Sequence, residues 1–515
     1  MHFLQPIPES SSDLEEGVDL PHAHNPWSCN RGQNLLVLNA GFLGLQGVFT
    51  VLFGSTTAYL KSLGLGGWLI SLSWLAGPIA GALFQPYVGV WSDNCSSSLG
   101  KRRPFIIAGT VLIILSLIGT ARAKQIVTLF SLSSGSTSES HIGLVIFVEI
   151  CILILNFAIQ PVQLGLRSLI VDLVPQEQQH EANAWAARFT LGGNILGYCL
   201  GSVDLPRHLP FLGRAQFQAL SSLVSINLLL CTSITCYFIK EQKSGVHDSS
   251  YHPTTARSGI RDLWKTLRTL PSSTRTVCFA QFFSWLGWFP FLFYASSYVG
   301  ALKRQDFSID SQGVSPRWEE SARAGSLAMS VFALSSFVMG LVLPQVVELS
   351  SRFESSLSLK SSWRWNPELF TLRRIWLAGQ VIFAGSMLLT FFKRISVAYI
   401  IVGAIGFSWA TSAWIPYAII GTDIQRQIQQ AECIGMNDEG ARVVAKVMGI
   451  HNISIASPQI ISALACSLFF WLRGNDHAGE VDATTYALLL SIAGSAAIAS
   501  AWVIRDLPEE SYHQM

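Results

Sequence analysis

A stripe of polar side chains lies inside an apolar stretch of the sequence between residues 142 and 170. Asn156, Gln160, Gln163 and Arg167 are spaced so that they share one face of a helix. Amides both donate and accept hydrogen bonds, so this stripe suits a neutral ligand rich in hydroxyl groups. The alternative, which stays open for any single amide, is that these groups only join helices to one another inside a membrane.

Two titratable side chains also lie in apolar stretches. Glu149 precedes Asn156 on the same stripe, and His451 stands beside Asn452 in a second stretch. Charged groups are costly in hydrocarbon unless they face a cavity or a partner, and imidazole titrates near neutral pH. Glu149 and His451 are therefore candidate proton carriers, with a structural hydrogen bond as the alternative for each.

Aromatic side chains offer a second set of candidate ligand contacts. Flat rings stack on the apolar faces of sugar-like rings while amides bind the hydroxyls. We accordingly expect Trp285, Tyr294 and Trp409 to contact a ligand. The alternative is an aromatic belt at the membrane surface, which we favour for Trp288 and Trp471.

Charged residues close to the ends of the apolar stretches are candidates for gating. We expect Asp93 to form an ion pair with the basic cluster at Lys101, Arg102 or Arg103. We also expect Asp172 to pair with Arg167. Pairs of this kind can form in one conformation of a protein and break in another.

The composition indicates a membrane protein. Half of the 515 residues are hydrophobic, 13% are charged, and the mean hydropathy is +0.40. A formal net charge of +2 leaves no basic face for nucleic acid. The nine cysteines are scattered, and the sequence has no phosphate-binding loop, metal-spaced cluster or nucleophile–base pair. We therefore expect no enzyme activity, no cofactor and no metal.

Long apolar runs predict an all-α polytopic protein of about twelve membrane-spanning helices in two six-helix halves. The halves cover 34–239 and 275–504, joined by a central loop at 240–274 and flanked by tails at 1–33 and 505–515. Lys and Arg counted over alternate loops place both tails and the central loop in the cytoplasm. The predicted spans are 34–60, 67–91, 104–121, 142–170, 183–204, 217–239, 275–299, 323–348, 373–391, 395–421, 442–471 and 483–504.

Several segments in chain order resemble the major facilitator superfamily, in the form carried by sucrose–proton symporters of the glycoside-pentoside-hexuronide branch. They are the loop within Gly77–Phe105, the runs Gln163–Asp172 and Gly193–Tyr198, the aromatic run Ser284–Tyr294 and the run Gly449–Asn452. The style of the loops is most similar to fungal members. The resemblance implies the facilitator fold and alternating access. It also implies that Asn194 and Asn452 join the candidate ligand contacts.

The resemblance implies a secondary active transporter of an α-linked disaccharide, sucrose or maltose, coupled to protons. In the symporters an aspartate eleven residues before the arginine carries the proton, whereas this chain has Asn156 there. An amide cannot titrate, so a sugar uniporter remains an alternative, as does an exporter of a hydroxylated metabolite. The expected partners are a sugar, a proton and the lipid bilayer. We expect a monomer in the plasma membrane, with an internal membrane as the alternative.

Overall fold

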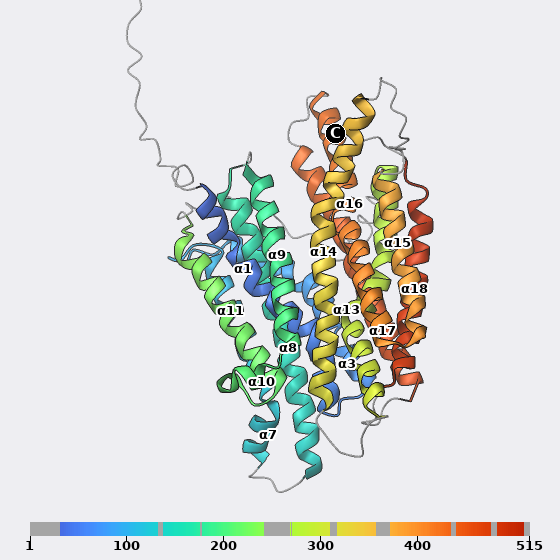
Figure 1. Cartoon of the computed structure of the whole chain (residues 1–515). Helices are drawn as coiled ribbons and strands as arrows, with labels where there is room; N and C mark the ends of the chain where they lie inside the picture. Colours follow the sequence, from blue (N-terminus) through green and yellow to red (C-terminus); the bar gives the residue numbers. More distant parts are fainter. Residues whose placement is uncertain are drawn as a thin grey trace, which may run out of the picture.

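The computed structural model describes residues 31–131, 137–175, 178–241, 268, 270–308, 317–356, 371–433, 439–474 and 481–508. Every regular element formed by these residues is a helix (Figure 1). Most of the tail at 1–33, most of the central loop at 240–274 and the end of the tail at 505–515 lie outside the described residues. The predicted helical, polytopic fold is confirmed.

The first half is a bundle whose first two spans are interrupted helices. Its first span is α1 with α2, and its second is a series of short segments from α3 to α5. Two short helices, α7 and α10, lie in its loops. The elements are α1 (Arg31–Val51), a π-helical turn (Leu52–Thr56), α2 (Thr57–Ser62), α3 (Gly67–Ser73), α4 (Ala76–Ile79), a π-helical turn (Ala80–Phe84), α5 (Gln85–Asp93), α6 (Arg103–Ala121), α7 (Ala123–Ser131), α8 (Thr137–Leu173), α9 (Gln179–Ser202), α10 (Leu205–His208) and α11 (Gln216–Phe238).

The second half is formed by six long helices. Three of them, α13, α14 and α16, extend well beyond the apolar runs that predicted them, because a helix can continue past the hydrocarbon into water while hydropathy marks only the apolar part. The helices are α13 (Ser272–Ser308), α14 (Arg317–Ser356), α15 (Leu372–Leu389), α16 (Ile395–Cys433), α17 (Glu439–Leu472) and α18 (Ala483–Ile504).

Eleven of the described helical stretches are long and apolar enough to cross a membrane. The remaining predicted span, the fifth, is the 24-residue helix α9, whose polar side chains lower its hydropathy. Glycines let α9 approach its neighbours closely: a Cβ at Gly197 would overlap with Thr50 of α1, and one at Gly201 would lie 2.9 Å from Ser326 Oγ of α14. Small residues at such contacts are the usual means of packing helices inside a bilayer.

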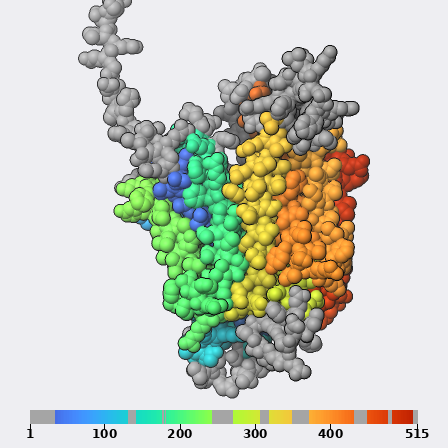
Figure 2. All heavy atoms as spheres, in the orientation of Figure 1, coloured from blue at the N-terminus to red at the C-terminus, as the bar shows by residue number. Residues whose placement is uncertain are grey.

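The two halves stand side by side, with α9 of the first against α14 of the second (Figures 1 and 2). We name the two ends of the bundle after residues that they carry. The Arg102 end holds the start of α1 and the end of α18, and is the upper end in Figure 1. The Lys61 end holds the end of α2 and the start of α14.

Among the described residues, one cluster of buried apolar side chains continues from the first half into the second, and it does so toward the Lys61 end. The larger buried cluster includes Leu52 and Trp74 of the first half together with Phe293 and Tyr294 of the second. A second cluster, around Trp376, is formed by residues of the second half alone and occupies its Arg102 end. The halves are thus joined by their core toward the Lys61 end.

Candidate functional site

Hydrogen bonds close the space between the halves toward the Lys61 end. The Ser71 hydroxyl of α3 lies 2.6 Å from the Tyr294 hydroxyl of α13. Ser467 of α17 donates to the Trp68 carbonyl of α3 at 2.9 Å. Thr57 donates to the Phe293 carbonyl at 3.1 Å, so the first and second spans are both fastened to the second half.

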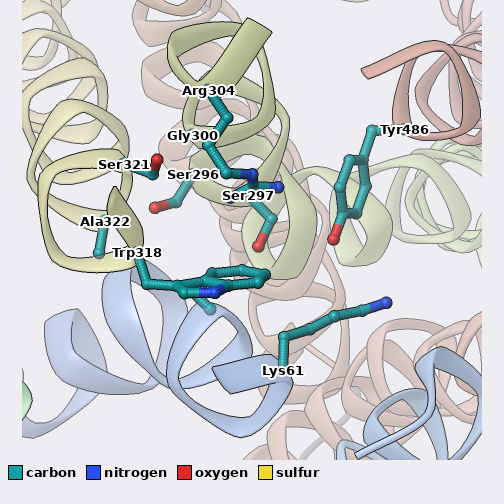
Figure 3. A pocket seen from close by; sticks show the side chains of 10 residues that line it. Lys61, Ser296, Ser297, Gly300, Arg304, Trp318, Ser321, Ala322 and Tyr486 are labelled. Carbon is teal, nitrogen blue, oxygen red and sulfur yellow. The ribbon is translucent and has the colours of Figure 1, made fainter. Parts of the chain in front are cut away.

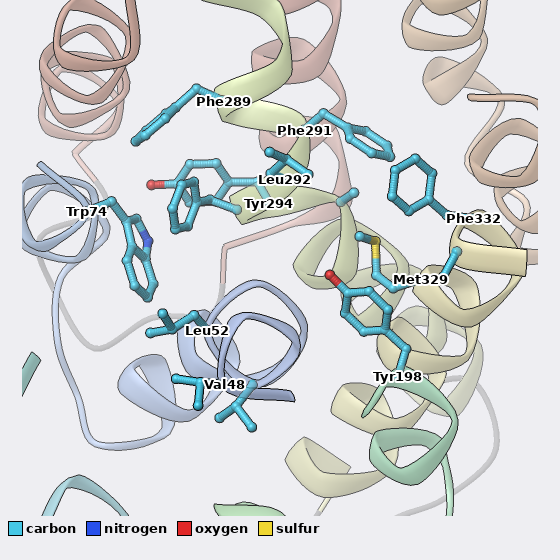
Figure 4. Close-up of a cluster of buried hydrophobic side chains, with 14 of the residues drawn as sticks. Val48, Leu52, Trp74, Tyr198, Phe289, Phe291, Leu292, Tyr294, Met329 and Phe332 are labelled. Atoms are coloured by element: carbon cyan, nitrogen blue, oxygen red, sulfur yellow. The ribbon is translucent and has the colours of Figure 1, made fainter. Parts of the chain in front are cut away.

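Aromatic rings fill the same seal. Trp74 stacks on Phe293 with ring centroids 4.5 Å apart, and Phe53 meets Phe293 edge-on at 4.9 Å. Figure 4 shows Trp74, Leu52 and Val48 of the first half facing Tyr294, Phe289 and Leu292 of the second. Tyr294 was expected to contact ligand, but the structure places it in this seal, 2% exposed and bonded to Ser71.

Charged groups surround the seal at its outer rim. Arg323 of α14 lies 3.5 Å from Asp204, and Glu319 accepts from the Gln216 backbone N–H at 3.0 Å. A small pocket nearby is lined by Lys61, Arg304 and Trp318, with the Arg304 guanidinium 4.4 Å from the Trp318 ring centroid (Figure 3). Its volume is about 10 Å³, room for about one water and too small for a sugar.

The amide stripe of α8 faces the interrupted second span. Asn156 and Gln160 are each 7% exposed and donate to carbonyls of their own helix, at Ile152 (2.9 Å) and Asn156 (3.2 Å). A Cβ at Gly77 would lie 3.0 Å from the Asn156 amide oxygen, and one at Gly81 would lie 3.8 Å from that of Gln160. The two amide oxygens are therefore turned toward glycines of the second span. Gln163 is half-buried and Arg167 is exposed farther toward the Arg102 end.

The two other candidate asparagines differ in their surroundings. Asn194 of α9 accepts a 2.7 Å hydrogen bond from Gln46 of α1, a partner that the sequence did not indicate. Asn452 of α17 is exposed. Asn194 therefore joins two helices of the first half, while Asn452 is accessible.

The two candidate proton carriers have unlike environments. The Glu149 carboxylate accepts a hydrogen bond from the Ser73 hydroxyl, which is 2.8 Å from both of its oxygens. The His451 side chain is fully buried, and neither of its ring nitrogens has a hydrogen-bond partner among the described residues. Its ring meets Tyr417 of α16 edge-on at 4.8 Å. The structure therefore gives Glu149 a polar neighbour on the second span and His451 an aromatic one.

The tryptophans of α13 and α16 form one cluster in the second half. Trp409 lies 6.1 Å from Trp285 and 5.0 Å from Trp288, measured between ring centroids. Trp285 and Trp409 are half-buried, whereas Trp288 is only 1% exposed. The expectation that Trp288 belongs to a surface belt is wrong, because it is packed inside the second half. Trp471 is 58% exposed, as a belt residue would be.

Arg102 is the centre of a charged network at its end of the first half. Its guanidinium lies 2.6 Å from Asp93 and 2.7 Å from Asp172, and donates to Ser92 at 2.9 Å. The expected pairing of Asp93 with the basic cluster is confirmed. The expected Arg167–Asp172 pair is replaced by Arg102–Asp172, because residues five apart on a helix point about 140° away from each other.

Glu241, just after α11, fixes the start of α6. Its carboxylate accepts from the backbone N–H groups of Lys101, Arg102 and Arg103 at 2.6, 2.9 and 3.0 Å. At a helix N-terminus such N–H groups have no carbonyl partner within the helix, and a negative charge beside them is stabilising. The sequence did not predict Glu241, because nothing in its spacing links it to a loop 140 residues away.

Residues 45–308 match the family model described as MFS/sugar transport protein. The general alpha-glucoside permease of Schizosaccharomyces pombe is 31% identical over 534 residues, covering 92% of this chain and 93% of the relative. The chain belongs to the MFS/sugar transport family. Within it, a sucrose transport protein of Oryza sativa subsp. japonica is 28% identical, covering 88% of this chain and 85% of the relative.

Solved structures agree on the fold of this family member. A D-xylose–proton symporter superposes with a TM-score of 0.52 at 14% identity, covering 92% of this chain and 97% of that one. A nucleoside transporter superposes with a TM-score of 0.59 at 13% identity, covering 92% and 99%. The family match, together with the fold, makes the chain a membrane transporter of sugars and not an enzyme.

The Arg102 network predicts that Arg102→Gln destabilises the protein more than Arg167→Gln does. The first change removes a buried cation from two carboxylates, at a cost of about 1–3 kcal/mol, whereas Arg167 is exposed and without an ion pair to Asp172. Thermal unfolding of both variants in detergent measures the difference. Equal stability of the two variants would contradict the network's role.

Proposed function

We propose that this transporter takes up a neutral α-linked disaccharide, sucrose or maltose, together with a proton. The observation that carries the substrate class is the likeness to the alpha-glucoside permease of fission yeast along 92% of the chain. The rice sucrose transport protein supports the same class of sugar. A monomer suffices for this function, because one chain contains both halves that enclose the sugar. We place this monomer in the plasma membrane.

The proposed orientation has the Arg102 end in the cytoplasm. Basic residues are enriched in cytoplasmic loops, and this end carries Lys101, Arg102 and Arg103 between the second and third spans. The conformation is then closed to the outside by the Ser71–Tyr294 seal. Alternating access requires that this seal opens when the halves close at the Arg102 end.

The proposed sugar site lies between α8 and the tryptophans of α13 and α16. Asn156, Gln160 and Gln163 supply hydrogen bonds, and Trp285 with Trp409 supplies flat apolar surface. Asn156 and Gln160 use one N–H each within α8, which leaves their amide oxygens and a second N–H for hydroxyls. Asn452 adds an amide from α17, while Asn194 supports the site indirectly through Gln46.

Glu149 is the proposed proton carrier. It lies on the same helix as the amides, in the first half, and its partner Ser73 belongs to the second span, next to the seal. Asn156 cannot carry a proton, and this one departure from the symporters favours a second candidate function, facilitated diffusion of the same sugars. His451 is the alternative carrier, since it is buried with free ring nitrogens.

The sugar site predicts that Asn156→Leu and Gln163→Leu each raise the KM for sucrose or maltose. Loss of one hydroxyl contact costs about 1–3 kcal/mol, or roughly a fivefold to 150-fold rise in KM. Uptake of labelled sugar into a transport-deficient host measures it, with surface expression as the control. If neither sugar enters, or both variants have the wild-type KM, the site is assigned wrongly.

Proton coupling predicts that sugar added to cells expressing the transporter makes the medium more alkaline. Glu149→Gln removes the titrating group and should abolish this change, whereas His451→Gln should retain it. A pH electrode in a weakly buffered suspension records both. Sugar uptake by the wild type without proton movement, and unaffected by an uncoupler, would instead establish facilitated diffusion.

A further inference from the structure

The short helix α3 is joined to the rest of its span at two bendable points. Before it, Gly64 has a backbone φ of +92°, a conformation that favours glycine, and the chain reaches α3 through Leu65 and Gly66. After it, the regular α-helical hydrogen bonding lapses at Trp74 and Leu75, whose backbones stay helical, before α4 begins. α3 is thus a seven-residue segment set off from α4 by a point where the span can bend.

In this conformation α3 is docked mainly on the opposite half. Ser71 is bonded to Tyr294, and the Trp68 carbonyl is bonded to Ser467. Gly67 lies directly against the Phe470 ring, which its missing side chain permits. Farther along the same span, α4 contacts both α17 and α8, and α5 packs against α8 of its own half. The span therefore passes from a segment held mainly by the second half, α3, through α4, which contacts both halves, to α5, which is held by the first.

One side-chain bond fastens α3 to its own half. Ser73, the last residue of α3, donates to Glu149 of α8 at 2.8 Å, and its oxygen also lies 2.9 Å from the Leu69 carbonyl within α3. A serine hydroxyl has a single proton, so these two acceptors compete for it. A hydrogen bond to a charged carboxylate is roughly twice as strong as a neutral one. The ionisation of Glu149 therefore decides how strongly α3 is held to α8.

The neighbouring elements contain few other groups that could compete for Glu149. α3, α4 and the π-helical turn Ala80–Phe84 carry no titratable side chain, and α6 has only Arg103, at the far end. Glu149 forms no ion pair with any described residue. The titratable groups of its own helix and of nearby elements toward the Lys61 end include His141, Cys151, Tyr59, Arg122 and Lys124. His141 lies beside Gly64, and Tyr59 is bonded to the Thr120 and Ala121 carbonyls.

We propose that α3 is a separately moving gate and that Ser73 is the positioning residue through which Glu149 controls it. With Glu149 ionised, Ser73 holds α3 to α8, so that α3 leaves α17 when the halves part at the Lys61 end. With Glu149 protonated, the Ser73 proton turns to the Leu69 carbonyl and the carboxyl O–H can donate only a weaker, neutral bond to the Ser73 oxygen. α3 then stays docked on α17, closing the gate. Binding of a proton thereby favours the closed gate, as symport requires. This inference rests on the proposed role of Glu149 in coupling.

A disulfide between positions 67 and 470 reports the docking of α3 directly. A Cβ built on Gly67 lies 3.2 Å from the Phe470 Cβ, close to the separation of about 3.5–4.5 Å in disulfides. Gly67→Cys with Phe470→Cys also removes the ring that a side chain at 67 would meet. The pair is introduced with Cys466→Ala, because Cys466 lies one turn from position 470. The rate of oxidative cross-linking is measured in membranes from about pH 5 to about pH 8.

The comparison is between Ser73→Ala and Ser73→Thr in this cysteine background. Because all variants carry the same thiols, the pH dependence of oxidation itself cancels in the ratio of their rates. We expect the ratio of the parent rate to the Ser73→Ala rate to fall about five- to tenfold as pH rises. Ser73→Thr, which keeps the hydroxyl, should behave as the parent does. Ser71→Ala on the same helix should slow cross-linking at every pH and leave its pH dependence unchanged.

Two other results would overturn the proposal. If the ratio of the parent rate to the Ser73→Ala rate is flat with pH while Glu149→Gln abolishes proton movement, Glu149 couples by another route and the proposed function stands. If that ratio is flat and Glu149→Gln still moves protons with sugar, the proposed role of Glu149 fails as well.

Discussion

Hydrocarbon excludes a sugar's hydroxyl groups, so a sugar transporter must enclose a polar path and keep one end of it shut. In this chain the shut end depends on α3, which belongs to the first half by sequence and is docked on the second. The Ser71–Tyr294 and Ser467–Trp68 hydrogen bonds hold it there, and the Trp74–Phe293 stack lies directly after it. That closure determines from which side of the membrane a ligand can reach the amide stripe, Glu149 and the tryptophan cluster.

The charged network at the other end supports this arrangement by keeping the first half rigid. Arg102 joins the ends of α5, α6 and α8, and Glu241 ties the end of α11 to the start of α6. All of these groups belong to the first half. The Arg102 end of this half can therefore open or close as a unit, while the movement that we propose for α3 takes place at the break after Ser73.

The sequence predicted what periodicity within one helix determines. The stripe of Asn156, Gln160, Gln163 and Arg167 lies on one face of α8, and Asp93 meets the basic cluster close to it in the chain. Contacts between distant helices were missed, such as Gln46 with Asn194 and Ser71 with Tyr294, because packing and not spacing creates them. Trp288 was misplaced because lipid and protein core are equally apolar, so hydropathy cannot distinguish a residue that faces one from a residue that faces the other.

The central claim is that the amide stripe of α8 is reached from the Arg102 end, through Gln163, while the Lys61 end is shut. Labelling of a single cysteine at Gln163→Cys by a membrane-impermeant maleimide, applied to either face of sealed vesicles without sugar, tests it most directly. The account predicts labelling from the cytoplasmic face, with protection by bound sugar. Labelling from the external face alone would contradict it.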